Sequence, residues 1–399
     1  MKKILITLFL LIVSSFAYAD PWKGYPYNSS EIPNHANPDY KILKHYLKKY
    51  IKDRKDRKGY KFKVKASKNF KKFNFNLQKD NFVNKQLNET AMLSYLMYEN
   101  GNIIIDEITP KERFGKILKN NTQYVSHSVG KSLISYITGH AICKGYISGI
   151  NHRLNDWSVL ENTLFYDQPI INLLNMASGS QNYVNSKYGL LGSDRWVNSV
   201  SVQSIMKKEL KNSEVARLRY NYNNLDTNII ASYVLYKMGH KEFKNLLNEI
   251  LVDKAGIEND VWLFKQVLSS KQATLTYSYY ASRYDFLRIA VAMLEDWNRN
   301  TCEGQYLKSL FENRIKKIDP SDPTAWSFES NSDDGYGSTS TYGGQFHMGI
   351  SGKREVPIFV MDGYGGQSHS IDFENNKIIS IMAIHRDYDW KMLVHQKLK

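Results

Sequence analysis

Cysteine and proline are scarce in this sequence, which has two cysteines and nine prolines among 399 residues. Cys143 and Cys302 stand far apart in the chain, so it contains no C-x-x-C metal or redox motif and cannot form a dense disulfide framework. One long-range disulfide between these two residues remains open. Since 42% of the residues are hydrophobic and 13% are aromatic, the chain can bury a sizeable core, which excludes a wholly disordered protein.

Several catalytic and ligand-binding motifs are also missing. The sequence contains no G-x-S-x-G turn of the α/β-hydrolase type, no glycine-rich phosphate-binding loop and no H-E-x-x-H zinc motif. Its ten histidines include no pair at metal-ligand spacing. We therefore expect no metal and no cofactor. After the N-terminus, no apolar run approaches the roughly 18 residues that a membrane-spanning helix needs.

Residues 1–19 have the pattern of a cleaved secretory signal. Two lysines precede an apolar stretch that begins at Ile4, and Ala17-Tyr18-Ala19 supplies the small residues of a cleavage site. The segment carries no cysteine that could accept a lipid. We expect cleavage after Ala19 and a soluble mature protein in the periplasm or outside the cell.

The formal net charge of +15 is concentrated in one segment. Residues 41–72 hold 15 lysines and arginines against two aspartates, which leaves the rest of the mature chain close to neutral. Within this segment, the apolar residues from 42 to 51 recur at helical spacing and predict an amphipathic helix. A solvated face is the first interpretation of such a basic arm. The alternative is a weak contact with an anionic envelope surface, and nucleic-acid binding is not expected.

Strand patterns occur near both ends of the chain. AMLSYLMY and NIIIDEI flank Asn100-Gly101, which is a strong hairpin signal, and strand-like runs recur from Tyr342 to His385. The middle, from about Ser128 to about Trp297, has mostly helical periodicity. This order predicts an α+β fold in which both chain ends form one antiparallel sheet with flanking helices, and a mostly helical part is inserted between them.

Ser128 and Lys131 carry the main chemical signal. They lie three residues apart in YVSHSVGKSLISYITGHAICKGYI, whose apolar positions predict a buried helix. Residues three apart share a helix face, so the lysine amine would lie near the serine hydroxyl. A serine needs such a base, and a lysine serves only if desolvation or a nearby cation lowers its pKa. Ser204 and Lys207 repeat the spacing, and an isolated match is more often a helix cap with a surface lysine.

Three segments together resemble one family. SHSVGKSL resembles the nucleophile helix of the serine β-lactamase and penicillin-binding-protein superfamily, in particular the class C-like branch of D-aminopeptidases, esterases and 6-aminohexanoate-oligomer hydrolases. IINLLNMASGS resembles the LLxMxSG segment of that branch, and GYGGQ resembles its third active-site motif. The similarity runs from roughly Leu93 to His385 and implies a β-lactamase/transpeptidase-like fold.

The domain organisation follows from this resemblance. A basic arm at residues 20–75 would follow the signal peptide and precede a serine hydrolase domain at residues 76–399. The α/β part of that domain would cover about 76–150 and 298–399, and the helical part about 151–297.

The resemblance also implies a role for each candidate residue. Ser128 would be the nucleophile, while Lys131 and the tyrosine of a Tyr-x-Asn motif would share general-base and general-acid duties. Tyr222 is the preferred tyrosine because YNNLDTNIIASYVLYKMG matches the family's Tyr-Ser-Asn followed by an apolar helix. Asn224 would then hold substrate or Lys131. The less favoured candidates are Tyr98, Tyr183 and Tyr220 for the tyrosine and His127 for the base.

The third motif departs from the best-known family pattern. Lactamases and peptidases of the superfamily have Lys-Thr-Gly or His-Thr-Gly, whereas this chain has Tyr364-Gly365-Gly366. The glycines suit a strand that admits substrate against its backbone, and the N–H of Gln367 would donate to the oxyanion beside that of Ser128. An arginine elsewhere, Arg354 or Arg386, could replace the missing cation.

We therefore expect a secreted or periplasmic serine hydrolase that cleaves an ester or a small amide through an acyl-enzyme on Ser128. The aromatic residue of the third motif resembles the esterase and aminohexanoate-hydrolase relatives. One alternative is a D,D-peptidase or β-lactamase that acts on cell-wall peptide or a β-lactam, which the missing cation weakens. The other is a non-catalytic relative that binds an envelope ligand, against which the intact serine, lysine and tyrosine argue.

Overall fold

The computed structural model describes residues 60–115, 118–184, 200–265, 275–318, 339–384, 393–394 and 397–398. The predicted signal peptide, the predicted amphipathic helix at 42–51 and Arg386 lie outside the described residues. Within these ranges, none of the helices is both long enough and apolar enough to cross a membrane.

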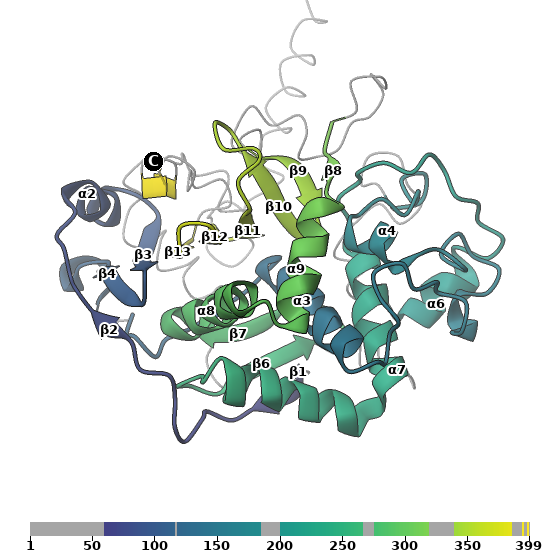
Figure 1. Ribbon diagram of the computed structural model, residues 1–399, viewed down its shortest axis with the longest axis horizontal. Helices are drawn as coiled ribbons and strands as arrows, with labels where there is room; N and C mark the ends of the chain where they lie inside the picture. The colour runs from purple at the N-terminus through teal and green to yellow at the C-terminus, as the bar shows by residue number, and fades with distance from the viewer. Residues whose placement is uncertain are drawn as a thin grey trace, which may run out of the picture.

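The described strands form two sheets (Figure 1). The larger sheet consists, in spatial order, of β2 (Asn74–Phe75), β4 (Asn102–Ile108), β3 (Met92–Glu99), β13 (Lys377–Ala383), β12 (Gln367–Asp372), β11 (Ile358–Gly363), β10 (Phe346–Ile350), β9 (Thr339–Gly343) and β8 (Ile315–Lys316). The smaller sheet consists of β1 (Tyr60–Val64), β6 (Val261–Lys265), β7 (Tyr279–Ser282) and β5 (Gln123–Val125). Neighbouring strands are antiparallel except β2 and β4, which are parallel.

The centre of the larger sheet joins the two ends of the chain. β3 and β4 form the predicted hairpin, and both residues of its Asn100-Gly101 turn have positive φ, as a tight hairpin turn requires. β3 also pairs along its length with β13, so an early and a late strand lie side by side. This pairing confirms the predicted α+β fold with a sheet formed by both chain ends.

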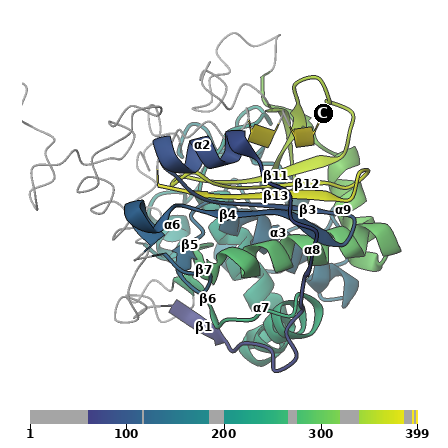
Figure 2. The same ribbon diagram turned by 90° about the vertical axis from the view of Figure 1, so that its left-hand side faces the viewer.

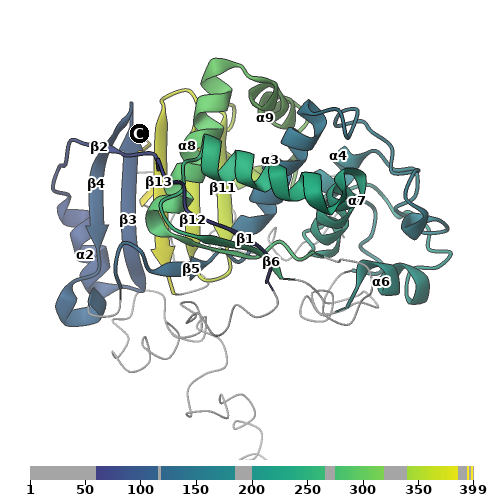
Figure 3. The ribbon, with the colours of Figure 1, turned by 90° about the horizontal axis from the view of Figure 1, so that it is seen from below.

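Helices cover both faces of the larger sheet (Figure 2). α2 (Asn81–Glu89) packs on β3 and β4 from one side, while α3 (Val129–Cys143) and α8 (Arg283–Arg299) pack on β11, β12 and β13 from the other. α9 (Cys302–Glu312) packs on α3 and α8. Figure 3 shows α4 and α6 to one side of the sheet. The other described helices are α4 (Ile170–Leu174), α6 (Val202–Lys208), α7 (Leu225–Asn248), η4 (Lys111–Gly115), η5 (Ser158–Leu160) and η6 (Glu249–Lys254).

The smaller sheet departs from the sequence prediction. β6 and β7 lie inside residues 151–297, the part predicted as mostly helical. Each is a short apolar and aromatic run, and periodicity cannot distinguish a strand from a buried helix over so few residues. Their outer partners, β1 and β5, come from distant parts of the sequence, so no local pattern marks the sheet.

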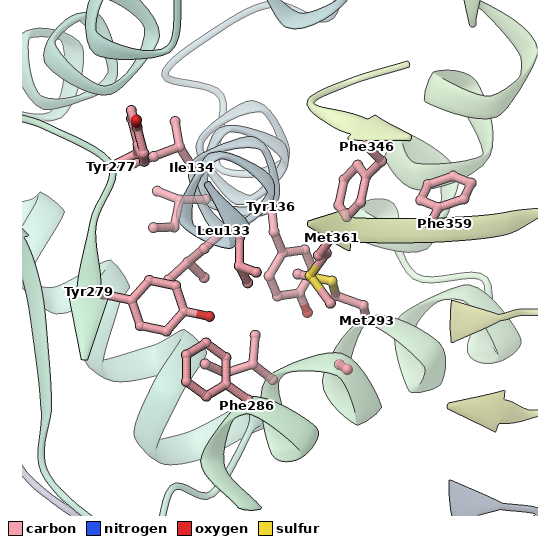
Figure 4. Close-up of a cluster of buried hydrophobic side chains, with 14 of the residues drawn as sticks. Leu133, Ile134, Tyr136, Tyr277, Tyr279, Phe286, Met293, Phe346, Phe359 and Met361 are labelled. Atoms are coloured by element: carbon pink, nitrogen blue, oxygen red, sulfur yellow. The ribbon is translucent and has the colours of Figure 1, made fainter. Parts of the chain in front are cut away.

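α3 is the helix most enclosed by the core. Every residue from Val129 to Ala141 is buried, because other elements pack on all sides of the helix. The buried residues include polar ones, Lys131 among them. Figure 4 shows its Leu133, Ile134 and Tyr136 among Tyr277, Tyr279, Phe286, Met293, Phe346, Phe359 and Met361. These partners come from the smaller sheet and its lead-in, from α8 and from the larger sheet. Ser128 immediately precedes the first turn of α3, so its position is fixed by a rigid, well-packed helix.

A disulfide joins α3 to α9, which packs against it. It links Cys143 at the end of α3 to Cys302 at the start of α9. The structure thus pairs the two cysteines that the sequence left open, and it anchors the C-terminal end of α3.

Reduction of this disulfide is expected to lower the free energy of unfolding by about 2 to 5 kcal/mol, since the bond closes a loop with a sequence separation of 159. Thermal unfolding of the protein with and without a thiol reductant measures the effect. In the double variant Cys143→Ser, Cys302→Ser, the reductant should change nothing further. Equal melting temperatures of the oxidised and reduced wild-type protein would contradict the prediction.

Candidate active site

Ser128 stands immediately before α3, at its positive dipole end. Its side chain is only partly buried and makes no capping hydrogen bond to the helix. A serine at this position commonly caps the helix with its hydroxyl, but the Ser128 hydroxyl does not. N–H groups at a helix start favour negative charge, which suits an oxyanion that develops at a carbonyl attacked by this hydroxyl.

A constrained turn delivers Ser128 to this position. Ser126 is tied to β7, because its N–H donates to Tyr279 O at 2.8 Å and its Oγ accepts from Tyr279 N at 2.9 Å. His127 then adopts a left-handed conformation with φ of 46°. Three residues later, a Cβ on Gly130 would lie 2.0 Å from Tyr277 O, so only glycine fits there. The glycine of the motif thus lets the helix start lie directly against the strand lead-in.

Lys131 lies one helical turn after Ser128 and is 1% exposed. Its Nζ donates to Asn224 Oδ1 and lies 3.5 Å from Asn223 O. The same nitrogen lies 3.7 Å from the ring centroid of Tyr277 and 5.0 Å from that of Tyr222. The amine is therefore desolvated and held in place by an amide and two aromatic rings, rather than exposed on a helix surface.

Tyr222 and Asn224 come from the segment that leads into α7. Tyr222 is partly buried, with its ring edge-on to Tyr342 at 6.1 Å. Asn224 precedes the first residue of α7 but makes no capping hydrogen bond with its side chain. Its Oδ1 instead accepts from Lys131 and from Tyr277 Oη, the latter at 2.7 Å. Asn224 is 3% exposed, so of its two predicted roles the structure shows the contact with Lys131.

The third motif forms the turn between β11 and β12. Gly366 N donates to Gly363 O at 2.8 Å, and Gly366 has φ of 82°. A Cβ on Gly363 would lie 2.8 Å from Ser126 O, and the Tyr364 ring lies 5.9 Å from the His127 ring. The turn therefore lies against the residues that immediately precede Ser128. β11 is an interior strand, but it pairs with β10 only at His347 and Val360.

Gln367 lies at the start of β12, where the turn encloses its side chain. It is 0% exposed, as the first residue of β12, and its Oε1 accepts from Gly365 N at 3.0 Å. The side chain thus braces the turn from inside, and its N–H does not lie on the accessible surface beside Ser128. Tyr364, which is 37% exposed, is the accessible residue of the motif. The expected contact between the Gln367 N–H and an oxyanion stays a prediction.

The less favoured candidates lie in other settings. Tyr98 is on β3, which β13 and β12 separate from β11, and the phenol oxygen of Tyr183 accepts from Glu214 N at 3.4 Å. Tyr220 is 5% exposed and packs on Tyr342 at 5.1 Å. Burial lowers the pKa of His127 to about 4, so this imidazole is neutral at neutral pH.

The second Ser-x-x-Lys sequence lies inside α6, which begins two residues before Ser204. Ser204 N donates to Ser201 Oγ at 3.1 Å, and Lys207 is exposed. This is an ordinary capped surface helix, in contrast to the buried surroundings of Lys131.

A buried lysine and histidine lie behind Tyr222. The His347 ring on β10 stacks on the Tyr222 ring with 6.0 Å between centroids, and Lys317 Nζ donates to His347 Nδ1 at 2.7 Å. Burial, together with the charges of Lys317 and Lys131, holds the pKa of His347 well below its ordinary value. Acceptance of a hydrogen bond at Nδ1 fits a neutral imidazole.

Sequence reasoning did not find these surroundings. Tyr277, Lys317 and His347 belong to no motif, and each reaches the site from a different segment. The one signal in the sequence that could have marked these three residues is that each places a polar group in an otherwise apolar run. In the described part of the chain, no three histidine, cysteine or acidic side chains are grouped so that they could hold a metal ion.

Comparison with known proteins finds similar structures but no matching sequence. No protein-family model matches the chain, and no curated protein matches it. A Bacillus anthracis structure described as a 6-aminohexanoate-dimer hydrolase is similar, with a TM-score of 0.60, 15% identity and coverage of 92% of this chain and 95% of that one. So are a penicillin-binding protein of Bacillus halodurans (TM-score 0.54, 14% identity, 81% and 100% covered) and a D-amino acid amidase of Ochrobactrum anthropi (0.51, 12%, 74% and 86%).

These similarities identify the fold class. The chain has the β-lactamase/transpeptidase fold of the serine β-lactamase and penicillin-binding-protein superfamily. The predicted fold class is confirmed, and the predicted resemblance holds at the level of the fold.

Proposed function

We propose that this protein is a serine hydrolase that cleaves an ester or a small amide through an acyl-enzyme on Ser128. The observation that carries the proposal is the grouping at the start of α3. A serine hydroxyl free of capping duty lies one turn from a buried lysine, and that lysine faces the Tyr222 ring and is held by Asn224. Hydrolases and an amidase among the structurally similar proteins support the same reaction class.

In the proposed reaction, Ser128 Oγ attacks the carbonyl carbon of the substrate and its proton passes to Lys131 or Tyr222. The tetrahedral intermediate collapses, the leaving group departs with that proton, and an ester to Ser128 remains. Water then attacks this ester with the same residues as base, which releases the acid and restores the serine. The oxyanion would be bound by the N–H of Ser128 at the start of α3.

The third motif favours neutral substrates. A phenol at Tyr364 supplies an apolar face and a donor but no charge for a substrate carboxylate. Arg354 is exposed in the connection before β11, whereas the motif follows the other end of that strand, so it does not replace the cation there. A D,D-peptidase or β-lactamase remains the second candidate, because the fold is common to both groups.

Tyr364→Lys is expected to raise kcat/KM for carboxylate-bearing substrates by roughly tenfold to a hundredfold, the value of one charge-assisted contact of about 1.5 to 3 kcal/mol. Penicillins and D-alanyl peptides are suitable probes, compared with a neutral p-nitrophenyl ester as the control. The neutral ester should gain nothing. Efficient penicillin hydrolysis by the unmodified protein, together with weak esterase activity, would favour the second candidate instead.

Covalent labelling tests the proposed function itself. A fluorophosphonate should add one phosphonyl group to the mature protein, detected by intact mass and located on Ser128 by peptide mapping. Failure to label would favour the third candidate, a non-catalytic relative that binds an envelope ligand.

We also propose that the protein is exported, with cleavage after Ala19, and acts in the periplasm or outside the cell. The sequence pattern at 1–19 and the disulfide support this, since disulfides persist in oxidising compartments. The basic segment 41–72 would then make a weak contact with an anionic envelope surface.

A further inference from the structure

Asp226 is a buried carboxyl group that the reaction above does not use. It is the second residue of α7, two residues after Asn224, and it is 0% exposed. Its Oδ1 accepts from Ser178 Oγ at 2.9 Å, and its main-chain N–H donates to Asn223 Oδ1 at 2.8 Å. Ser178 belongs to the IINLLNMASGS segment, which thus contributes a hydroxyl to this carboxyl group.

The hydrogen bonding of Asp226 is incomplete. Among the described residues, nothing donates to Oδ2, although this atom is fully buried. On burial, a carboxylate loses its hydrogen bonds to water. If one of its oxygens gains no hydrogen bond from the protein, the charged form is destabilising. Desolvation raises the pKa of Asp226 to about 7, against the opposing effects of Ser178, Asn223 and Lys131. Such an unfavourable group beside a catalytic pair calls for a functional explanation.

The charged group that acts on Asp226 is Lys131 of α3. The other polar groups that contact Asp226 in the described chain are neutral. They are Ser178, whose Oγ lies 2.9 Å from Ser180 Oγ, and Asn223, which lies on the same segment as Asp226. Asn224, two residues away on the same turn, holds the Lys131 amine. The carboxyl group and the amine are therefore coupled by charge, with Asn224 fixing the amine. The other titratable groups that face the amine are Tyr222, Tyr277 and His347.

We propose that Asp226 is a positioning residue that sets the protonation state of Lys131, and this rests on the proposed function. With one proton between them, the pair is either ammonium with carboxylate or neutral amine with carboxylic acid. The two forms have the same total charge, so the buried site can hold a neutral amine without losing a proton to solvent. The neutral amine is the form that accepts the proton of Ser128.

The Asp226→Asn variant tests this inference through a pH profile. A carboxylate stabilises a neighbouring ammonium, so its removal lets the amine lose its proton at lower pH. The acidic limb of the rate constant for fluorophosphonate labelling of Ser128 should move down by about one pH unit, the lower end of the effect of a nearby opposite charge. Asp253→Asn removes the same charge from an exposed position and should leave the limb unchanged.

Ser178→Ala provides a second variant. Loss of the hydroxyl that donates to Oδ1 disfavours the carboxylate, so the limb should move in the same direction by a smaller amount. An unmoved limb in both variants would overturn the inference. If the wild-type protein itself does not label, the proposed function fails; if it labels but the limbs coincide, only the role of Asp226 fails.

Thermal unfolding shows whether Asp226→Asn folds and reports the cost of the carboxylate. Since the pKa of Asp226 is 3.8 in the unfolded reference and about 7 in the fold, the native state holds more protons between these values. Its stability therefore falls as pH rises through that window. Asp226→Asn should melt higher than the wild-type protein at pH 8 and close to it at pH 3. A lower melting temperature at pH 8 would contradict the strained carboxylate on which the inference depends.

Discussion

Replacing Ser128 with alanine is expected to lower kcat/KM for a p-nitrophenyl ester by roughly 10⁵- to 10⁶-fold, the scale found when a serine hydrolase loses its nucleophile. Water cannot attack the substrate carbonyl at a comparable rate without the pre-positioned hydroxyl. The fold should be unaffected, because the Ser128 side chain is partly exposed and makes no capping hydrogen bond. Ester turnover and intact mass after fluorophosphonate treatment measure the two losses, which should occur together.

Ser204→Ala is the matched control, since Ser204 lies in the first turn of α6 and also has a lysine three residues later. This variant should keep full turnover and labelling. If Ser128→Ala still labelled at another serine, the nucleophile would have been wrongly assigned.

Lys131→Met and Tyr222→Phe are each expected to lower turnover by roughly 10²- to 10⁴-fold, the usual contribution of one proton-transfer group. Methionine fills much of the volume of the buried lysine but cannot accept a proton. Phenylalanine keeps the ring contacts with Tyr342 and His347 and removes only the phenol oxygen. Steady-state kinetics with the same ester, alongside melting temperatures, separates lost chemistry from lost packing.

Lys207→Met tests the same substitution on an exposed side chain and should leave turnover within about twofold, as surface changes usually do. An essential Lys207 with a dispensable Lys131 would refute the choice between the two Ser-x-x-Lys sequences.

The parts of the fold that the sequence predicts are those with short-range signals. The Asn100-Gly101 hairpin and the apolar helix after Ser128 each depend on neighbours within a few residues. Helical spacing alone also places Lys131 one turn from Ser128. These local patterns, together with the order of strands and helices, are sufficient for the fold class.

The rest of the site depends on contacts between distant segments. Tyr277 reaches Lys131 only because β7 lies beside the start of α3, and periodicity does not predict that sheet. His347 stacks on Tyr222, and Lys317 reaches His347 from a different part of the larger sheet. Gln367, in contrast, belongs to a recognisable motif. Whether its N–H faces substrate still depends on where the hairpin turns, which the motif does not give.

The pairing of β3 with β13 has a consequence for how the chain acquires its structure. Met92–Glu99 can find its partner only after Lys377–Ala383 has been synthesised, so nearly the whole domain must be present before the central strand pair forms. Contacts of such long sequence separation carry a large loop-closure entropy and slow folding. Every candidate catalytic residue precedes β13, so the last strand contributes scaffold rather than chemistry. The sheet that supports the candidate active site is therefore complete only when β13 has joined it, although β13 contains no candidate catalytic residue.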